Sequence, residues 1–254
     1  MIQVKNLTYS YQKKGEPIIK DATFDVVQGK VNVLLGPNGV GKSTLIKCID
    51  RILDFKQGEI TINDKNVKEY KRNDLAKLVS YVSQEAKVEY LNVFECIMLG
   101  RIPYIQYFSK EKDEAIVTEL IKTFGIEHLA SRSFSTLSGG EKQIVMLLRC
   151  VAQDAQVILL DEPTANLDIK NSLMVLKFIK ELVEKKGLTI LISMHDISLA
   201  HMIADRYILL KNTQVLAQID KNQLTTNLLS ETFGVDFLIE SENVILNMEG
   251  GFQK

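Results

Sequence analysis

A glycine-rich stretch that ends in a lysine and two hydroxyl residues has the residue types and spacing of a phosphate-binding loop. It matches G-x-x-x-x-G-K-[ST] in full, and the residues expected to contact a nucleotide are Gly36, Asn38, Gly39, Gly41, Lys42, Ser43 and Thr44. Glycines let the backbone curl so that successive N–H groups point at phosphate oxygens. The lysine would reach the β- and γ-phosphates, and the Ser43 hydroxyl would complete the coordination sphere of Mg²⁺. The sequence therefore predicts a site for the phosphates of a nucleotide.

A second chemical element is a pair of carboxylates that follows a short apolar run. Residues 157–160 are Val-Ile-Leu-Leu, which is typical of a strand buried on both faces, and Asp161 and Glu162 come directly after it. Because the carboxyl end of such a strand lies at the same edge of the sheet as the phosphate loop, the two elements should meet. We expect Asp161 to hold Mg²⁺ through water and Glu162 to polarise the attacking water.

The elements that position these residues alternate between strands and helices. Residues 31–35 form a nearly continuous apolar run that leads into the loop, and residues 189–193 form another after a helix expected around 172–186. This alternation predicts a three-layer α/β core with a mainly parallel sheet. Between residues 92 and 153 the pattern has little strand character and several helix signals, which indicates an inserted α-helical subdomain.

Composition argues against several classes of protein. The 254 residues carry 31 Lys+Arg against 32 Asp+Glu, and the net charge of −1 argues against a dedicated nucleic-acid binder. Cys48, Cys96 and Cys150 are odd in number and widely spaced, so neither a disulfide framework nor a zinc cluster is expected. No run approaches the ~20 apolar residues of a membrane-spanning helix, and the start lacks the apolar stretch of a signal peptide. We therefore expect a cytoplasmic protein whose membrane role would come through a partner.

A third stretch, Leu137-Ser138-Gly139-Gly140-Glu141, precedes the paired carboxylates. Together with the phosphate loop, Gln84, Asn166-Leu167-Asp168 and His195, it resembles, in order, the motif set of the ATP-binding-cassette (ABC) ATPases. The resemblance extends from about residue 2 to residue 219. It implies the fold of the P-loop NTPases, with an N-terminal antiparallel β subdomain beside the parallel core.

The resemblance also implies roles for single residues. Tyr11 resembles the aromatic residue that stacks on adenine, with Tyr9 as the alternative and core packing as a structural interpretation of either. Gln84 resembles the loop glutamine that contacts Mg²⁺ and the attacking water. His195 resembles the switch histidine that contacts the γ-phosphate.

The signature residues Ser138, Gly139 and Gly140 open a helix and so offer N–H groups, a hydroxyl and a positive dipole end to an anion. In ABC ATPases that anion belongs to the ATP of a second copy. The resemblance therefore implies a head-to-tail homodimer that encloses two ATP molecules, with Asp168 at the seam between the two sites. Three positions depart from the family pattern, since Glu141 replaces the commonest glutamine, Ile144 stands where an arginine often follows, and Cys150 stands where alanine is usual.

The domain expectation is one cassette that spans residues 1–254. Residues 1–90 and 154–220 would form the α/β core, and residues 91–153 the helical subdomain with the signature. Residues 221–254 would be a short C-terminal segment.

One element of the helical part narrows the kind of transporter. The stretch Leu99-Gly100-Arg101-Ile102-Pro103-Tyr104 resembles the Gly-Arg-x-Pro-Tyr element of cassettes from iron–siderophore, haem and cobalamin importers, and a helix stop before proline is its structural alternative. The resemblance implies an ATPase at the inner face of the cell membrane, bound to permease subunits that receive cargo from an extracytoplasmic binding protein. The alternatives are the cassette of an exporter and a non-transport ABC protein.

Overall fold

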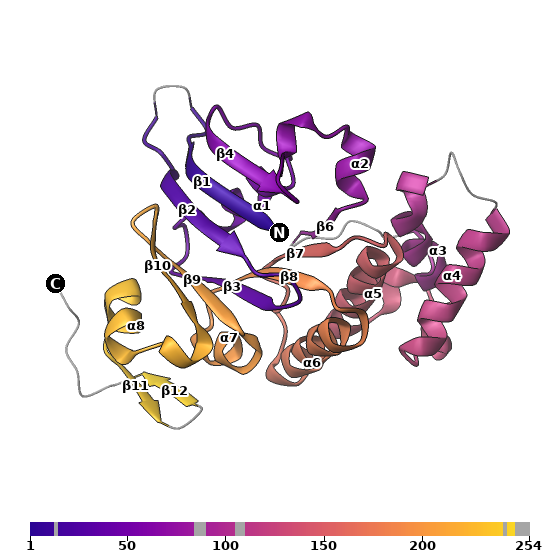
Figure 1. Ribbon diagram of the computed structural model, residues 1–254. Helices are drawn as coiled ribbons and strands as arrows, with labels where there is room; N and C mark the ends of the chain where they lie inside the picture. The colour runs from indigo at the N-terminus through magenta and orange to yellow at the C-terminus, as the bar shows by residue number, and fades with distance from the viewer. Residues whose placement is uncertain (13–14, 84–89, 105–109, 241–242, 247–254) are drawn as a thin grey trace.

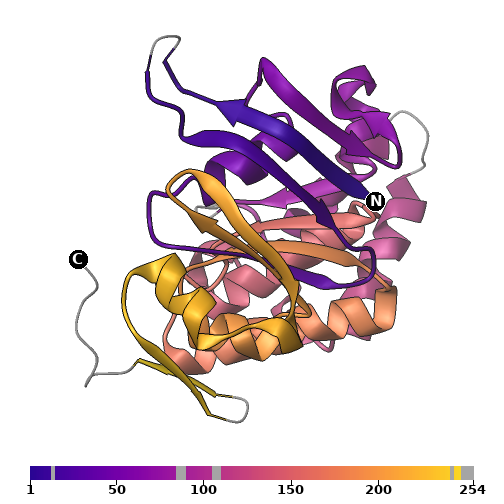
Figure 2. The same cartoon turned by 60° about the vertical axis from the view of Figure 1, so that its left-hand side comes forward.

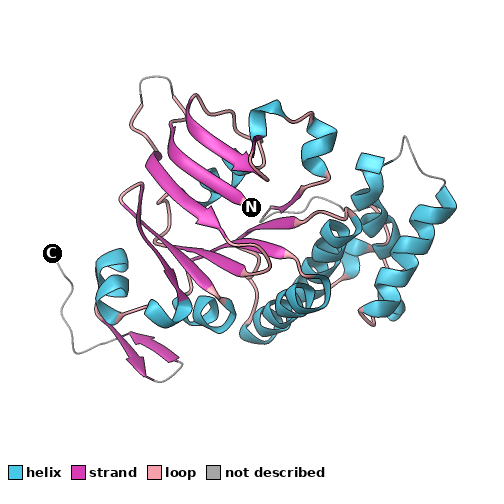
Figure 3. Cartoon of the chain, in the orientation of Figure 1, coloured by secondary structure: helices cyan, strands magenta, loops and turns pink. Residues whose placement is uncertain are grey.

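The computed structural model describes residues 1–12, 15–83, 90–104, 110–240 and 243–246 (Figure 1). A central sheet lies between a second sheet on one side and a layer of helices on the other, and Figure 3 shows both sheets in magenta and the helices in cyan. Among the helices in these ranges, none combines the length and the apolar composition that crossing a bilayer requires.

The central sheet carries the strand ends at which the chemical residues lie. Its strands are hydrogen-bonded in the order β10-β9-β3-β8-β7-β6, and every neighbouring pair is parallel except β9 and β10. The strands β3, β7 and β8 are buried along their whole length, as the apolar runs predicted. The bounds are β3 (Val31–Leu35), β6 (Val79–Val82), β7 (Val157–Asp161), β8 (Thr189–Met194), β9 (Arg206–Lys211) and β10 (Gln214–Asp220).

The second sheet is antiparallel and lies over the central one (Figure 2). Its order is β2-β1-β4-β5, with β1 (Ile2–Tyr9), β2 (Ile19–Val26), β4 (Gln57–Ile62) and β5 (Lys65–Asn66). The side chains of Ala22, Phe24 and Val26 alternate with exposed ones, so one face of β2 is buried. The expected N-terminal antiparallel subdomain is therefore confirmed.

Two apolar clusters cover the two faces of the central sheet. On one face, Leu159 of β7 and Leu191 of β8 pack in the same cluster as residues of α1 (Lys42–Ile49) and of the antiparallel sheet. On the other face, Leu160 and Ile192 pack with helices α5 (Gly139–Ala152), α6 (Ile169–Lys186) and α7 (Ile197–Ile203). The predicted three-layer core is confirmed. Because side chains alternate along a strand, Asp161 lies on the same face as Leu159, toward α1.

Helices occupy the region between β6 and β7, as expected. They include α3 (Val93–Met98), the 3₁₀ helix η2 (Leu99–Tyr104) and α4 (Lys110–Thr123), which pack with α5. A Cβ at Gly100 would lie 2.1 Å from the carbonyl oxygen of Arg149, so only glycine fits there. Arg101 is buried, and its guanidinium donates to Oδ1 of Asp113 and to the carbonyl of Ala152, each at 2.8 Å. The Gly-Arg pair thus has a packing role in holding η2 against α4 and α5.

The C-terminal part packs against the edge of the core. Helix α8 (Thr226–Phe233) contacts β9, and β12 (Asn243–Leu246), which pairs with β11 (Phe237–Glu240), contacts α7. The remaining short elements are η1 (Val67–Glu69), α2 (Arg72–Ala76), η3 (Glu127–Leu129), η4 (Phe134–Thr136) and η5 (Lys221–Gln223).

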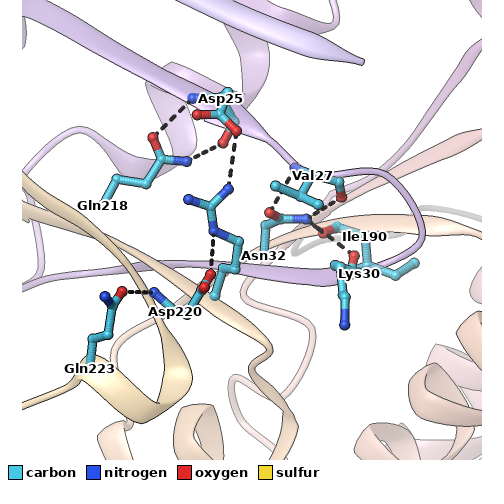
Figure 4. A network of polar contacts seen from close by, with 9 residues as sticks. Asp25, Val27, Lys30, Asn32, Ile190, Gln218, Asp220 and Gln223 are labelled. Atoms are coloured by element: carbon cyan, nitrogen blue, oxygen red, sulfur yellow. Dashed lines mark hydrogen bonds and ion pairs between the residues drawn. The ribbon is translucent and has the colours of Figure 1, made fainter.

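A polar network joins the two sheets (Figure 4). The guanidinium of Arg206 on β9 lies 3.1 Å from Oδ2 of Asp25 on β2 and 2.9 Å from Oδ1 of Asp220 on β10. Gln218 of β10 accepts a hydrogen bond of 3.1 Å from the backbone N–H of Asp25. These contacts tie the antiparallel sheet to the antiparallel edge of the central sheet.

Candidate functional site

The loop between β3 and α1 has a backbone that two of its glycines make possible. Gly39 and Gly41 have φ values of 79° and 107°, in the left-handed region that residues with a Cβ rarely adopt. A Cβ at Gly41 would also lie 2.7 Å from the carbonyl oxygen of Ile18, whereas one at Gly39 would meet no described atom within 4 Å. The loop is therefore packed against the chain at Gly41 and open at Gly39, as a phosphate cradle requires.

Lys42 is the buried cation of the loop, with 4% of its surface exposed. Its ammonium donates to the carbonyl oxygens of Gly36 at 2.8 Å and Pro37 at 3.0 Å, and lies 3.8 Å from Oε1 of Glu162. Burial lowers the pKa of Lys42 from its ordinary value, and the nearby carboxylates of Glu162 and Asp161 oppose that shift. A positive charge and a carboxylate thus face each other across the mouth of the loop.

Asp161 receives hydrogen bonds from three elements. Its Oδ1 accepts from the hydroxyl of Ser43 on α1 at 2.7 Å and from that of Ser193 on β8 at 2.8 Å, and its Oδ2 lies 3.4 Å from the hydroxyl of Tyr81 on β6. Burial raises the pKa of Tyr81, and the neighbouring Asp161 carboxylate raises it further, so the phenol stays a donor. Asp161 is buried, yet its lone pairs are well satisfied.

The donor set at this position fits Mg²⁺ rather than a softer metal. A hydroxyl and a carboxylate oxygen are hard ligands, and Mg²⁺ in phosphate sites takes one or two such protein ligands together with waters and substrate oxygens. Within the described residues no group of three or more His, Cys, Asp and Glu side chains is arranged to hold a metal. A magnesium site here would take Ser43 and Asp161 as protein ligands, with waters and a phosphate as the rest.

Glu162 and His195 directly follow β7 and β8, at the edge of the central sheet where the loop lies. Oε2 of Glu162 lies 3.4 Å from Nδ1 of His195, whose side chain is 46% exposed against 18% for Glu162. Glu162 has a φ of 48°, an uncommon conformation for a residue with a long side chain. A pocket of about 260 Å³ is lined by Glu162 and by loop residues including Lys42, Ser43 and Thr44.

Tyr11 lies at the rim of the same pocket. It is 61% exposed, and its hydroxyl lies 3.2 Å from Oγ1 of Thr44. Tyr9 makes an edge-on ring contact with Tyr11 at 5.2 Å and packs against the buried cluster below. An exposed ring beside the loop suits stacking on a base, whereas the environment of Tyr9 suits packing.

The signature stretch lies apart from this pocket. Ser138 is the N-cap of α5, where its hydroxyl accepts from the N–H of Glu141 at 3.3 Å and Oε2 of Glu141 accepts from the N–H of Ser138 at 2.7 Å. The hydrogen bond from the Ser138 backbone N–H and the nearby Ser138 hydroxyl lower the pKa of the Glu141 carboxyl below its usual value, so the carboxylate keeps the capping function at neutral pH. Ser138 and Gly139 are exposed, and none of the signature residues lines the pocket around Lys42 in the described part of the chain.

The glycines of the signature also have a packing reason. A Cβ at Gly139 would lie 2.7 Å from Cδ2 of Leu167, and one at Gly140 would lie 2.5 Å from Cε of Met174. The start of α5 therefore rests on the start of α6. Asp168 is the N-cap of α6 and accepts from the N–H of Asn171 at 2.7 Å, with its own side chain exposed. Ile144, at the position of the missing arginine, packs into the apolar cluster.

One residue predicted for the site lies outside the described residues, and two residues that contact Asp161 were not predicted from the sequence. Gln84 belongs to residues 84–89, which lie outside the described residues. Ser193 and Tyr81 contact Asp161 but were not singled out. The signal for Ser193 was a hydroxyl near the end of an apolar strand, two residues before His195.

Comparison with known proteins agrees with this geometry. A family model described as "ABC transporter" matches residues 19–165. An uncharacterised ABC transporter ATP-binding protein of Methanocaldococcus jannaschii is 37% identical and covers 95% of this chain and 94% of its own length. A phosphonates import ATP-binding protein of Synechococcus is 32% identical, and the match covers 92% of this chain and 90% of the relative. A petrobactin import ATP-binding protein of Bacillus subtilis is 30% identical, and the match covers 95% of this chain and 96% of the relative.

A solved structure is similar over the same range. The dimeric structure of a bacterial ABC transporter cassette matches with a TM-score of 0.76 and 27% sequence identity. The match covers 88% of this chain and 100% of the cassette's chain. With the phosphate loop, the buried Lys42 and the Asp161–Glu162 pair at one sheet edge, these similarities identify the chain as a member of the ABC transporter family, an ATP-binding cassette with ATPase activity.

Proposed function

We propose that this cassette is the ATP-hydrolysing subunit of an ABC importer and that Glu162 is the base of the reaction. The observation that carries the proposal is the convergence of Lys42, Asp161 and Glu162 at the carboxyl edge of the central sheet. Two distances support a shared site for one phosphate group. Nζ of Lys42 lies 3.8 Å from Oε1 of Glu162, and Nδ1 of His195 lies 3.4 Å from Oε2 of Glu162.

The chain's own residues account for binding and for proton transfer. The N–H groups of the loop and the Lys42 ammonium would hold the phosphates and offset their negative charge. The Glu162 carboxylate would orient the attacking water and accept its proton, since it is partly exposed and lies beside the loop. His195, whose Nδ1 lies 3.4 Å from Oε2 of Glu162, would contact the γ-phosphate. Tyr11 would provide the apolar surface for adenine.

Ser43 and Asp161 would hold Mg²⁺, with Gln84 as a further contact that the family resemblance implies. Bound Mg²⁺ supplies charge neutralisation at the β- and γ-phosphate oxygens. The hydrogen bond of 2.7 Å between Ser43 and Asp161 supports their action on one ion.

The proposal includes a second copy of the chain. Ser138 and Gly139 are exposed at the start of α5, and they lie outside the pocket around Lys42 within the described residues. Such an exposed N-terminal helix end suits the phosphate of a partner's nucleotide, with Asp168 and Gly140 nearby. The similarity to a dimeric cassette supports the same arrangement. Two copies would then close on two ATP molecules and loosen after hydrolysis.

Import is supported by the named relatives, whose printed functions are petrobactin import and phosphonates import. The Gly100-Arg101 element favours a cargo of the iron–siderophore, haem or cobalamin kind. The chain would then act as a single cassette at the cytoplasmic face of the membrane, bound to permease subunits and served indirectly by an extracytoplasmic binding protein.

Two measurements test this proposal in separate steps. The purified chain should hydrolyse ATP in the presence of Mg²⁺ and lose that activity with EDTA; hydrolysis that persists in EDTA would contradict the metal assignment. For import, the chain should co-purify from detergent-solubilised membranes with permease subunits. In a second assay, membrane vesicles that contain the transporter are mixed with the binding protein and a ferric chelate. ATP-dependent uptake of the chelate supports import, whereas efflux alone would contradict it.

A further inference from the structure

Ser193 occupies a position from which one hydroxyl can control both carboxylates of the site. It lies on β8 directly opposite Asp161 of β7 in the parallel register, and it is fully buried, with 0% of its surface exposed. Its neighbours along β8, Ile192 and Met194, point into the cluster on the other face. The Ser193 side chain therefore points to the α1 side, where Asp161 lies.

The Ser193 hydroxyl uses both of its hydrogen-bonding capacities on consecutive residues. It donates to Oδ1 of Asp161 at 2.8 Å and accepts from the backbone N–H of Glu162 at 2.9 Å. The first bond fixes a carboxylate, and the second fixes the peptide plane between Asp161 and Glu162. One serine hydroxyl thus contacts both the proposed metal ligand, Asp161, and the backbone of the proposed base, Glu162.

The backbone of Glu162 explains why that second bond has an effect on its side chain. With a φ of 48°, Glu162 adopts a conformation that a residue with a Cβ holds only when its surroundings fix it. The described contacts that do so are the N–H bond to Ser193 and a bond of 3.1 Å from the N–H of Ala165 to the Glu162 carbonyl. This turn directs the side chain of Glu162 toward Lys42 and His195.

We propose that Ser193 is a positioning residue of the ATPase reaction, which sets the orientation of the Asp161 carboxylate and of the Glu162 side chain. This inference rests on the proposed function of Glu162. Ser43 also donates to Asp161 but has its own role in the site, and Tyr81 contacts the other carboxylate oxygen at the longer distance of 3.4 Å. Ser193 has no role beyond these two hydrogen bonds among the described contacts.

The sheet offers a matched control for a buried serine. Ser80 on β6 is 2% exposed, and its hydroxyl donates to Gln153 at 3.0 Å rather than to a residue of the site. Ser193→Ala and Ser80→Ala therefore remove the same group from the same sheet, and only the first removes it from Asp161 and Glu162. Ser193→Thr retains the hydroxyl, and Ser193→Cys retains the volume with a weak hydrogen-bonding group.

The experiment measures kcat and KM for ATP, nucleotide affinity with a fluorescent ATP analogue, and hydrogen exchange of the Glu162 amide by NMR. In Ser193→Ala and Ser193→Cys, kcat should fall about 10-fold or more while KM and nucleotide affinity stay within about threefold. The Glu162 amide, without its acceptor, should exchange about 10-fold faster or more. Ser193→Thr should restore kcat to within about threefold of the parent, and Ser80→Ala should change neither kcat nor the Glu162 amide.

A kcat of Ser193→Cys within about twofold of an active parent would overturn the inference, and so would an unchanged Glu162 amide. An equal loss in Ser80→Ala would also overturn it, because both serines would then act only through the stability of the sheet. The proposed function is tested separately, by the ATPase activities of the parent chain and of Glu162→Gln. Absent hydrolysis in the parent, or full activity in Glu162→Gln, would refute that function and not the hydrogen bonds of Ser193.

Discussion

The hydroxyl of Ser43 lies 2.7 Å from a carboxylate oxygen of Asp161, although 118 residues separate them in the chain. The contact exists because Ser43 lies in the first turn of the helix after β3, whereas Asp161 ends β7, and β8 joins β3 and β7 in one parallel sheet. The carboxyl ends of parallel strands meet at one edge, so loop, carboxylates and histidine are gathered there.

Lys42→Ala should abolish tight ATP binding, because the variant removes the buried ammonium that faces Glu162 across the loop. Equilibrium binding of a fluorescent ATP analogue measures the effect, and we expect a loss of about 100-fold or more in affinity, or roughly 3 kcal/mol. Lys47→Ala, in the last turn of the same helix, is the control and should bind as the parent does. An affinity of Lys42→Ala equal to the parent's would refute the cradle assignment.

Ser138→Arg should block hydrolysis while sparing nucleotide binding by the single chain. The large side chain would fill the exposed start of α5, where the second copy's nucleotide is proposed to bind. Steady-state ATPase and nucleotide affinity are measured together, with Ser131→Arg as an exposed control outside the signature. We expect hydrolysis to fall by about 100-fold at an affinity within about threefold of the parent. If binding and hydrolysis fell together, the variant would have misfolded and the dimer assignment would lose its support.

Asp50 should make the stability of the fold depend on pH. Burial raises the pKa of Asp50 to about 7, and Arg72 opposes the shift. The folded state then binds a proton that the unfolded state has released, so this contribution to stability is full below the unfolded pKa of 3.8 and is lost as pH rises through about 7.

Asp50→Asn removes that titration, so it should be more stable relative to the parent at pH 8 than at pH 4. Urea unfolding at both values measures the difference, which should change by on the order of 1 kcal/mol or more, since one pKa unit corresponds to about 1.4 kcal/mol. A difference that is constant between the two pH values would contradict the raised pKa of Asp50.

Asn32→Leu should destabilise the fold strongly without touching the site. Asn32 is fully buried on β3, where its amide oxygen accepts from the N–H of Val27 at 3.0 Å and its NH₂ donates to the carbonyl of Val27 at 3.0 Å (Figure 4). Leucine would leave both backbone groups unpaired, at a cost of roughly 2–4 kcal/mol in the free energy of unfolding. Asn73→Leu, at an exposed position, is the control and should stay within about 0.5 kcal/mol. A loss for Asn32→Leu no larger than the control's would refute the role of the amide.

The sequence predicted the chemistry better than the packing that supports it. The phosphate loop and the apolar strands β3, β7 and β8 have local patterns that specify their type, so their places in the core were foreseen. The strands β4 and β9–β10 were not predicted individually, because their pairing depends on partners distant in the chain. Single residues show the same limit.

Gly100 and Arg101 illustrate what a local pattern cannot show. As letters they resemble an element of importer cassettes, and only the fold shows that a Cβ at Gly100 would clash with Arg149 and that Arg101 is paired with Asp113. The role of Ser193 could not be predicted for the same reason, because its hydroxyl contacts Asp161 on the neighbouring strand, and the sequence does not show which strands are neighbours. Contacts between distant segments are what sequence patterns leave undetermined.

The central claim is that the carboxylate of Glu162 acts as the base for ATP bound beside Lys42. The most direct measurement is the steady-state ATPase rate of Glu162→Gln at saturating ATP and Mg²⁺, with Glu184→Gln on the exposed side of α6 as the control. The account predicts a rate about 10²-fold or more below the parent's, with ATP still bound and the control unaffected. A parent-like rate in Glu162→Gln would contradict it.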